Sequence, residues 1–263
     1  MRRRAFLATA LLGKLAPGGT NDPTRGLPVL TYHRFDPTQS RSATVVTKAV
    51  FAAQMAWLVD QKFRVVALRD AVAKAQGTVI PGPAVAITAD DGWRSVYTDM
   101  FPVLQRYRLQ ATLFINPPMI GHGGAYLTWA MITEMVHSGL VEVQPHTLTH
   151  PNFNTERARR DPEAYQSFVD EQIHGSRVQI TERLGSPADL LAWPYGVHDA
   201  FLEKAAAAAG CRAAFALGSR AVSVGDPVYA LPRYQIYESD GTSRFAYVAS
   251  GYPRLATHAK GSS

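Results

Sequence analysis

Apolar and polar positions divide the chain into short apolar runs and longer stretches with a helical period. The short runs are rich in β-branched and aromatic residues and are bounded by Gly, Pro and Asp, which predicts buried strands. The longer stretches carry apolar side chains three and four positions apart, which predicts amphipathic helices. The expected strands cover 28–33, 63–68, 84–89, 111–115, 140–144, 190–193, 213–217 and 229–236.

Helices are expected between these strands, at 48–61, 69–76, 97–107, 129–138, 160–184 and 198–209. Thr128 and Gly139 bracket one of them as N-cap and stop, and Gly185 is a suitable end for another. Residues 36–47 and 116–125 are expected to form loops, and the chain after 236 to be irregular. Strands that alternate with helices predict an α/β fold around a mostly parallel sheet, open or closed.

The N-terminus has the layout of an export signal. Arginines at 2–4 precede an apolar run that is too short to span a bilayer as a stable helix. The sequence Arg3-Arg4-Ala5-Phe6-Leu7 is similar to a twin-arginine signal, which implies export to the periplasm or the cell exterior. We therefore expect signal and linker at 1–27, one domain at 28–250 and a disordered tail at 251–263, with no transmembrane segment.

Composition indicates a globular protein with a mild positive charge. Of the 263 residues, 46% are hydrophobic and 18% charged, and the formal net charge is +6. Such a charge favours attraction to an anionic polymer or cell envelope. Basic residues do not form a stripe interleaved with aromatics, so we expect no nucleic-acid partner. The single cysteine, Cys211, excludes an internal disulfide and a cysteine metal cluster, and its apolar surroundings predict a core position.

Polar residues end three of the predicted strands. Asp90-Asp91-Gly92 follows the strand at 84–89, His146 and His150 follow the strand at 140–144, and Trp193-Pro194-Tyr195-Gly196 ends the strand at 190–193. Taken alone, each of these segments is more often a solvated turn or a structural pair. The carboxyl ends of parallel strands gather on one side of a sheet, however, so the three segments can meet.

Two imidazoles and one carboxylate form a ligand set that suits a divalent metal with open positions. His146 and His150 are four residues apart, a spacing that brings both rings to one side if the segment is one helical turn. The second aspartate of the pair would then remain free to accept a proton from the attacking water. Neighbouring strand residues point to opposite sides, so both aspartates reach one site only if Gly92 allows a turn.

The motifs resemble those of the polysaccharide deacetylase family, the NodB-homology domain of carbohydrate esterase family 4. The resemblance runs from about residue 84 to 217, with the blocks in the family's order. The matching segments are Thr88-Ala89-Asp90-Asp91-Gly92, Pro102-x-Leu104-x-x-Tyr107, Ala111-Thr112-x-Phe114, Leu127-Thr128-Trp129, Glu134-Met135, His146-Thr147-x-x-His150 and Ala192-Trp193-Pro194-Tyr195-Gly196.

This resemblance implies a single distorted (β/α)7-type barrel of mostly parallel strands and the metal-dependent removal of acetyl groups from sugar polymers. It implies that Asp91, His146 and His150 bind one divalent metal ion. Zinc is the expected ion, and cobalt, nickel or iron(II) also suit the set. Asp90 would be the catalytic base, and the backbone N–H of Tyr195 would stabilise the oxyanion.

Two departures from the family pattern bear on the mechanism. Ala192 stands where the family usually has an arginine that orients the base, and Asp240 is a weaker candidate for that role. The family also usually has a late strand that ends in a histidine acting as general acid, whereas residues 213–263 contain only His258. His33 ends the first predicted strand instead, which resembles the permuted, exported poly-β-1,6-N-acetylglucosamine deacetylases. We therefore expect His33 to be the general acid, the alternative being a histidine that only packs or caps the strand.

Weaker candidates concern the substrate. Trp93, Trp193 and Tyr195 offer aromatic surface for a sugar, and His122 lies in a glycine-rich loop. The expected function is metal-dependent hydrolysis of N-acetyl groups on an amino-sugar polymer, most specifically poly-β-1,6-N-acetylglucosamine. Peptidoglycan or chitooligosaccharides are alternative substrates. A non-catalytic glycan-binding module is an alternative of another class, which only Ala192 favours.

Overall fold

The computed structural model describes residues 25–36 and 42–251. The export signal expected at 1–27 falls outside these ranges except for its last residues, and the tail expected at 251–263 falls outside except for Gly251. Both therefore stay predictions. Among the described residues, no helix combines the length and hydropathy that a bilayer crossing requires.

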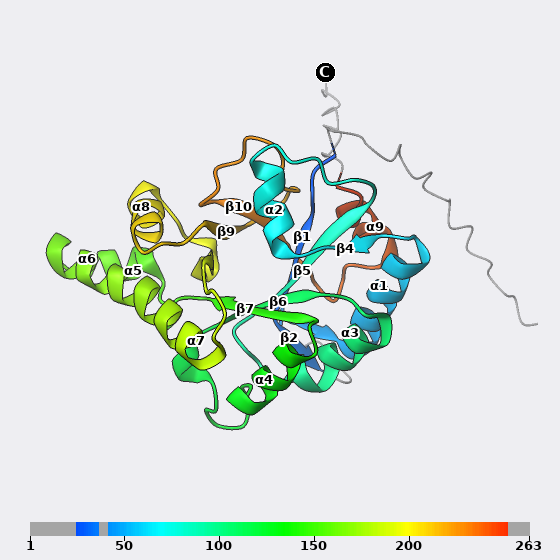
Figure 1. The fold of residues 1–263 in the computed structure, drawn as a ribbon, viewed down its shortest axis with the longest axis horizontal. Coiled ribbons are helices and arrows are strands. Elements are labelled where there is room, and N and C mark those ends of the chain that lie inside the picture. Colours follow the sequence, from blue (N-terminus) through cyan, green and yellow to red (C-terminus); the bar gives the residue numbers. More distant parts are fainter. Residues whose placement is uncertain (1–24, 37–41, 252–263) are drawn as a thin grey trace, which may run out of the picture.

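Seven parallel strands form a nearly closed barrel in the order β7-β6-β5-β1-β10-β9-β8 (Figure 1). This confirms the predicted α/β barrel, since every neighbouring pair in that path is parallel. A short strand, β4 (Arg64–Val65), pairs with β5 outside the path. The barrel strands are β1 (Val29–Tyr32), β5 (Ala84–Asp90), β6 (Ala111–Ile115), β7 (Val141–Pro145), β8 (Leu190–Ala192), β9 (Ala213–Gly218) and β10 (Leu231–Gln235).

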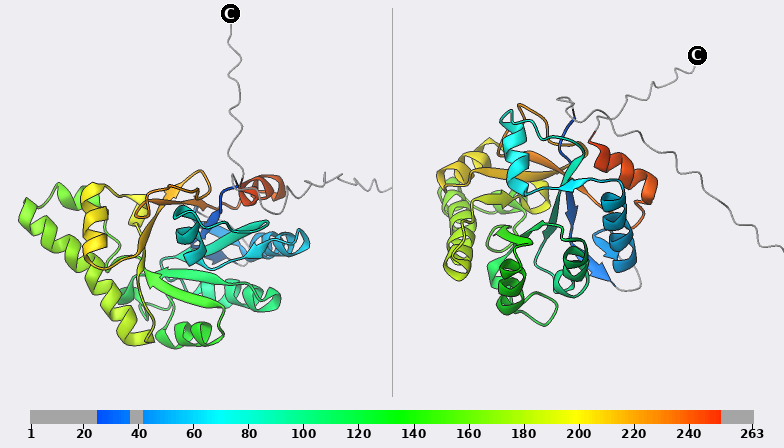
Figure 2. Two further views of the ribbon diagram at one scale, coloured as in Figure 1. Left: turned by 45° about the horizontal axis from the view of Figure 1, so that its top comes forward. Right: turned by 45° about the vertical axis from the view of Figure 1, so that its right-hand side comes forward.

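Most of the helices pack around the outside of the barrel (Figure 2). The helix expected at 160–184 is present as α6 and α7, which continue one another through a π-helical turn at Glu171–Gly175. A short helix precedes them. The helices are α1 (Lys48–Asp60), α2 (Leu68–Ala75), α3 (Phe101–Tyr107), α4 (Trp129–His137), α5 (Phe153–Arg157), α6 (Pro162–Asp170), α7 (Ser176–Leu184), α8 (Ala200–Ala208) and α9 (Thr242–Ser250).

Two parts of the chain expected to be irregular are ordered. Helix α9 lies beside α1 because the ring of its Phe245 packs edge-on against Trp57, with ring centroids 5.8 Å apart. In the expected loop at 36–47, β3 (Val45–Thr47) pairs in parallel with β2 (Arg34–Asp36). Each of the two strands is only three residues long, too short to show a period in the sequence, which explains why the pattern did not predict the pair.

The period of two along β5 decides which side chains face the barrel interior. Val85 and Ile87 pack outward against the helices, whereas the smaller Ala84 and Ala86 lie in the interior cluster with residues of α2. Asp90 has the same parity as Ala84 and Ala86, so it faces the interior at the carboxyl end of the strand. The hydrophobic pattern therefore places one aspartate inside the barrel mouth.

A polar network spans the open seam of the barrel between β7 and β8. The buried Gln144 donates to Pro187 O and accepts from the backbone N–H of Leu190, so it links the two strands in place of a ladder. At the amino-terminal end of the barrel, Arg69 of α2 binds Glu142 and Asp189 at 2.8 and 2.7 Å. These contacts link the two edge strands across the seam.

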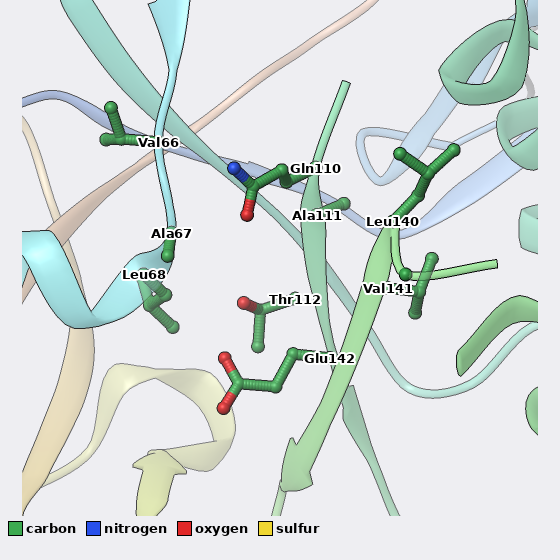
Figure 3. A pocket seen from close by; sticks show the side chains of 10 residues that line it. Val66, Ala67, Leu68, Gln110, Ala111, Thr112, Leu140, Val141 and Glu142 are labelled. Carbon is green, nitrogen blue, oxygen red and sulfur yellow. The ribbon is translucent and has the colours of Figure 1, made fainter. Parts of the chain in front are cut away.

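A cavity of about 100 Å³ lies at the amino-terminal ends of β6 and β7, beside the start of α2 (Figure 3). Gln110, Thr112 and Glu142 line it, together with apolar side chains. Glu142 is its carboxylate and is paired with Arg69. The chemistry predicted from the sequence belongs at the opposite end of the barrel, where β5 and β7 end.

Candidate active site

The chain turns sharply between the two aspartates. Strand β5 ends at Asp90, and Asp91 and Gly92 follow with φ of 73° and 71°. A left-handed backbone is unfavourable for most residues, but Asp and Gly are the types that adopt it most readily. The turn swings Asp91 out of the strand's alternation. Both carboxylates consequently reach one site, as the sequence predicts.

Asp91, His146 and His150 converge into one group of ligand atoms. One atom from each residue lies within 4.8 Å of the other two. The Oδ1 atom of Asp91 is 3.7 Å from Nε2 of His146 and 3.6 Å from Nε2 of His150. The imidazole rings meet edge to face, with centroids 4.7 Å apart. The three residues predicted as metal ligands therefore lie in place to share a metal ion.

The buried ring of His146 is held in one orientation by the chain itself. Its Nδ1 lies 2.8 Å from the carbonyl oxygen of Ala192. A carbonyl only accepts hydrogen bonds, so Nδ1 carries the proton and Nε2 presents its lone pair to Asp91. A second partner that fixes the tautomer in this way is typical of histidines that bind metals. Ala192 thus contributes through its backbone.

The segment from His146 to His150 is not a helical turn, so that part of the sequence interpretation is wrong. Thr147 and His150 adopt φ of 64° and 55°, which reverses the chain instead. The turn is secured from both sides. Asn116 donates its side-chain N–H to the carbonyls of His146 and Thr147, and Gln172 accepts from the backbone and hydroxyl of Thr149.

Burial keeps both histidines neutral at ordinary pH. It lowers the pKa of His146 to about 4, although the charges of Asp90 and Asp91 act in the opposite direction. Burial also lowers the pKa of His150, again against the effect of Asp91. A neutral imidazole is the form that binds a metal ion.

Arg233 takes the place of the arginine missing at Ala192. It lies on β10 with its side chain fully buried, and its two terminal nitrogens each donate to one oxygen of Asp90 at 2.8 Å. Its guanidinium also donates to the hydroxyl of Thr88 and lies over the ring of Phe114, 5.0 Å from the centroid. The bidentate pair fixes the orientation of the Asp90 carboxylate.

The same pair determines the charge of Asp90. Burial by itself would raise the pKa of this carboxyl group, but Arg233 and the neighbouring imidazoles of His146 and His33 outweigh it and lower the pKa to about 2. Asp90 is therefore ionised at neutral pH. It is held 3.7 Å from Nε2 of His146, beside the three ligand residues, where an ionised carboxylate can accept a proton.

Arg233 was not recognised from the sequence, and Asp240 was the wrong candidate. Asp240 is buried elsewhere, where it binds Arg244 and the backbone of Tyr237. The available signal was a charged residue in the middle of the predicted strand at 229–236, because a strand interior rarely buries an unpaired charge. Which carboxylate it would pair with depends on β10 lying next to β1 in the barrel, with β5 beyond β1.

His33 lies beside Asp90 at the carboxyl end of β1. The register pairs Tyr32 with Ala89, which places His33 and Asp90 next in line on neighbouring strands. The charge of His33 lowers the pKa values of both Asp90 and His150, so the three groups share one electrostatic environment. His33 is half-buried, and its role as the acid stays a prediction.

The aromatic candidates have different positions. Tyr195 sits in a turn with φ of 57°. The residue is 60% exposed, and its ring meets the His150 ring with centroids 4.7 Å apart. Trp193 is fully buried, donates to Tyr229 O and packs against Phe153, so its predicted contact with substrate is wrong. It was mistaken because an aromatic residue at a strand end gives no sign of which face it occupies.

Two further candidates lie on the other side of the site. Trp93 is half-buried and donates its indole N–H to Asp91 at 3.1 Å. His122 is exposed on the loop after β6, and none of the contacts seen among residues 25–36 and 42–251 joins it to the ligand group. His198 and Asp199 precede α8, where Asp199 is the N-cap, at the start of the helix expected at 198–209.

Comparison with known proteins agrees with this geometry. A sequence profile of the family described as polysaccharide deacetylase matches residues 79–214. The chain belongs to the polysaccharide deacetylase family. It is therefore a hydrolase of N-acetyl amide bonds, as the motif resemblance implied. The match covers Asp90, Asp91, His146 and His150, whereas His33 and Arg233 lie outside it.

Individual relatives extend the similarity over most of the chain. The chain is 28% identical over 233 residues to YxkH of Bacillus subtilis (strain 168), a protein named after the same family, covering 88% of this chain and 78% of YxkH. It is 24% identical over 195 residues to the poly-β-1,6-N-acetyl-D-glucosamine N-deacetylase of Staphylococcus aureus (strain MRSA252), covering 73% and 67%. The structure of IcaB from Ammonifex degensii superposes with a TM-score of 0.73 at 27% identity, covering 86% and 97%.

Proposed function

We propose that this polysaccharide deacetylase is metal-dependent and removes N-acetyl groups from poly-β-1,6-N-acetylglucosamine. One observation carries the metal dependence: Asp91, His146 and His150 bring their ligand atoms within 4.8 Å of one another, beside a carboxylate that Arg233 keeps ionised. Two neutral imidazoles and a carboxylate suit zinc and, by geometry and donor type, also cobalt, nickel or iron(II).

The chain's own residues supply the proton transfers of the hydrolysis. Asp90 accepts a proton from the water that attacks the acetamide carbonyl, and Arg233 holds its carboxylate for that step. The N–H of Tyr195 donates to the carbonyl oxygen as that oxygen becomes negative. His33 gives a proton to the departing nitrogen, so that the C–N bond breaks into acetate and a free amine. When bound, the metal ion polarises the carbonyl and lowers the pKa of the water.

The substrate assignment is supported by two independent features. The relatives from Staphylococcus aureus and Ammonifex degensii are named for poly-β-1,6-N-acetyl-D-glucosamine deacetylation and as IcaB. In this chain His33 directly follows β1 and lies beside Asp90, so a histidine from before the first motif stands next to the base, as the resemblance to the permuted deacetylases of this polymer implied. The alternative of a non-catalytic glycan-binding module was favoured only by Ala192. That argument no longer applies, because Arg233 orients Asp90 in place of the arginine missing at Ala192.

Acetate release tests this proposal. The metal-loaded protein is incubated with poly-β-1,6-N-acetylglucosamine, chitooligosaccharides and peptidoglycan, and acetate is measured against the Asp90→Asn variant. We expect release from the first polymer, and a fall of about 10²–10⁴-fold in the variant. Faster release from chitooligosaccharides or peptidoglycan would replace the substrate. No release from any of the three would contradict the function.

We also propose that the protein acts outside the cytoplasm, where such polymers lie. Arg3-Arg4-Ala5-Phe6-Leu7 supports this, although it precedes the described residues. Fusion of residues 1–27 to a reporter that is active only after export tests it. The Arg3→Lys/Arg4→Lys double variant should keep the reporter in the cytoplasm, and equal export of both fusions would contradict a twin-arginine route.

A further inference from the structure

The two oxygens of Asp91 have different partners. Oδ1 faces Nε2 of His146 and Nε2 of His150, whereas Oδ2 accepts the indole N–H of Trp93 at 3.1 Å. A carboxylate can bind a metal through one oxygen or through both. Here the indole occupies the second oxygen and leaves Oδ1 directed toward the two imidazoles.

Trp93 is itself fixed in place. Its ring stacks on Tyr126 at a centroid distance of 4.7 Å and an interplanar angle of 17°, and the two residues form an antiparallel bridge. Backbone bonds on both sides of Trp93, from Arg94 to Ala125 O and from Leu127 to Gly92 O, prevent the ring from moving with its own turn.

Arg34, which lies just after the end of β1, also contacts the Trp93 ring. The guanidinium of Arg34 lies over the Trp93 ring, 5.2 Å from its centroid. Arg34 directly follows His33, so the clamp of Arg34, Trp93 and Tyr126 connects three segments around the site. A side chain held by stacking and backbone pairing loses little further freedom when it donates a hydrogen bond, which makes that bond an effective restraint.

We propose that Trp93 is a positioning residue that restricts Asp91 to single-oxygen coordination of the metal ion. The inference rests on the proposed metal binding at Asp91, His146 and His150. Outer partners of metal ligands typically alter affinity by about 10–100-fold. Without the indole N–H, Asp91 loses its fixed orientation and Oδ2 is free to turn toward the ion. The metal affinity should therefore fall, and the coordination number should rise.

The test replaces Trp93 by Phe, which keeps a stacking ring and removes the N–H. Trp129→Phe is the matched control, because Trp129 also carries an arginine 5.2 Å from its ring and makes no contact with the ligand group in the described part of the chain. The zinc dissociation constant is measured by competition with a chelator. It should rise by about 10–100-fold in Trp93→Phe and stay unchanged in Trp129→Phe.

The visible spectrum of bound cobalt(II) distinguishes a positioning role of Trp93 from a purely structural one, because it reports the coordination number of the ion. A higher coordination number weakens the visible d–d absorption, so the cobalt bands of Trp93→Phe should be less intense than those of the wild type. Equal affinity and equal spectra would overturn the role of Trp93 and leave the proposed function standing. A wild-type protein that binds neither zinc nor cobalt would overturn both.

Tyr126→Leu gives an independent reading if Trp93→Phe fails to fold by circular dichroism. It keeps the indole N–H but removes the ring on which the indole stacks. The zinc dissociation constant should rise, by less than in a variant without the N–H. An unchanged value would show that the clamp does not restrain Asp91.

Discussion

Replacing Arg233 by Met removes both hydrogen bonds to Asp90 while keeping most of the buried volume. Arg233 and Asp90 have side-chain exposures of 0% and 2%, so water cannot replace the lost partner. The variant leaves an ionised carboxylate inside the barrel mouth. The change in the free energy of unfolding therefore measures how strongly Arg233 stabilises the ionised carboxylate of Asp90.

The structure sets the size of the effect. Lowering the pKa of Asp90 from its ordinary 3.8 to about 2 corresponds to about 2–3 kcal/mol. Loss of one partner from a buried pair typically costs about 3–5 kcal/mol, because the remaining charge is uncompensated. The second figure is the better guide, since it includes the burial that Arg233 offsets. We expect a loss of about 3–5 kcal/mol at neutral pH.

The pH dependence has a definite sign. In the wild type the pKa of Asp90 is depressed, so its contribution to stability is present above about pH 4 and is lost as the pH falls toward 2. In Arg233→Met, burial raises the pKa of Asp90 and the carboxyl group can take up a proton. The deficit of the variant should therefore be smaller near about pH 5 than near about pH 7.5.

Urea unfolding of the metal-free protein measures this directly. Arg233→Met and Asp90→Asn should each destabilise, whereas the double variant should recover most of the loss because no unpaired charge remains. Arg244→Met is the control, since Arg244 binds Asp240 but is 51% exposed, and should cost about 1 kcal/mol or less. Additive single effects, or a deficit independent of pH, would refute the reasoning.

Further predictions concern separate parts of the chain. His33→Ala should lower acetate release by about 10²–10⁴-fold with the zinc dissociation constant nearly unchanged, and an unaltered rate would assign the acid elsewhere. Burial raises the pKa of the Cys211 thiol to about 12, so a thiol reagent should label it only after unfolding; rapid labelling of the native protein would contradict this. Gly196→Ala should cost about 1–3 kcal/mol in urea unfolding, because its Cβ would lie 2.8 Å from Leu217 N at a φ of 70°. Gly139→Ala, with φ of 74° and open space around it, should cost less, and an equal cost would exclude the contact with Leu217 as the cause.

The hydrophobic pattern predicts the parallel α/β architecture because its strands are buried and alternate with helices, whereas closure into a barrel was implied by the family resemblance. Each strand carries its own signal, such as the alternation of Ala84 and Ala86 inward with Val85 and Ile87 outward. Helix α9 and the β2–β3 pair lack such a signal. They depend on contacts with distant segments, such as Phe245 on Trp57, which no local pattern contains.

The residues of the site also fall into those that the sequence could place and those that it could not. Asp90, Asp91, His146 and His150 could be placed together because the carboxyl ends of parallel strands share one end of the barrel. Arg233 could not, because its partner is set by strand order across the barrel and not by any spacing along the chain. The sequence also could not show that the turn at Thr147 is left-handed.

Acetate release as a function of added zinc tests the central claim most directly. The protein is stripped with a chelator, zinc is returned stepwise, and acetate from poly-β-1,6-N-acetylglucosamine is measured at each step beside the Asp91→Ala variant. The rate should be near zero without metal, rise to a plateau at about one equivalent, and stay near zero in the variant. A full rate in the stripped protein, or a plateau in Asp91→Ala, would contradict a metal-dependent site at Asp91, His146 and His150.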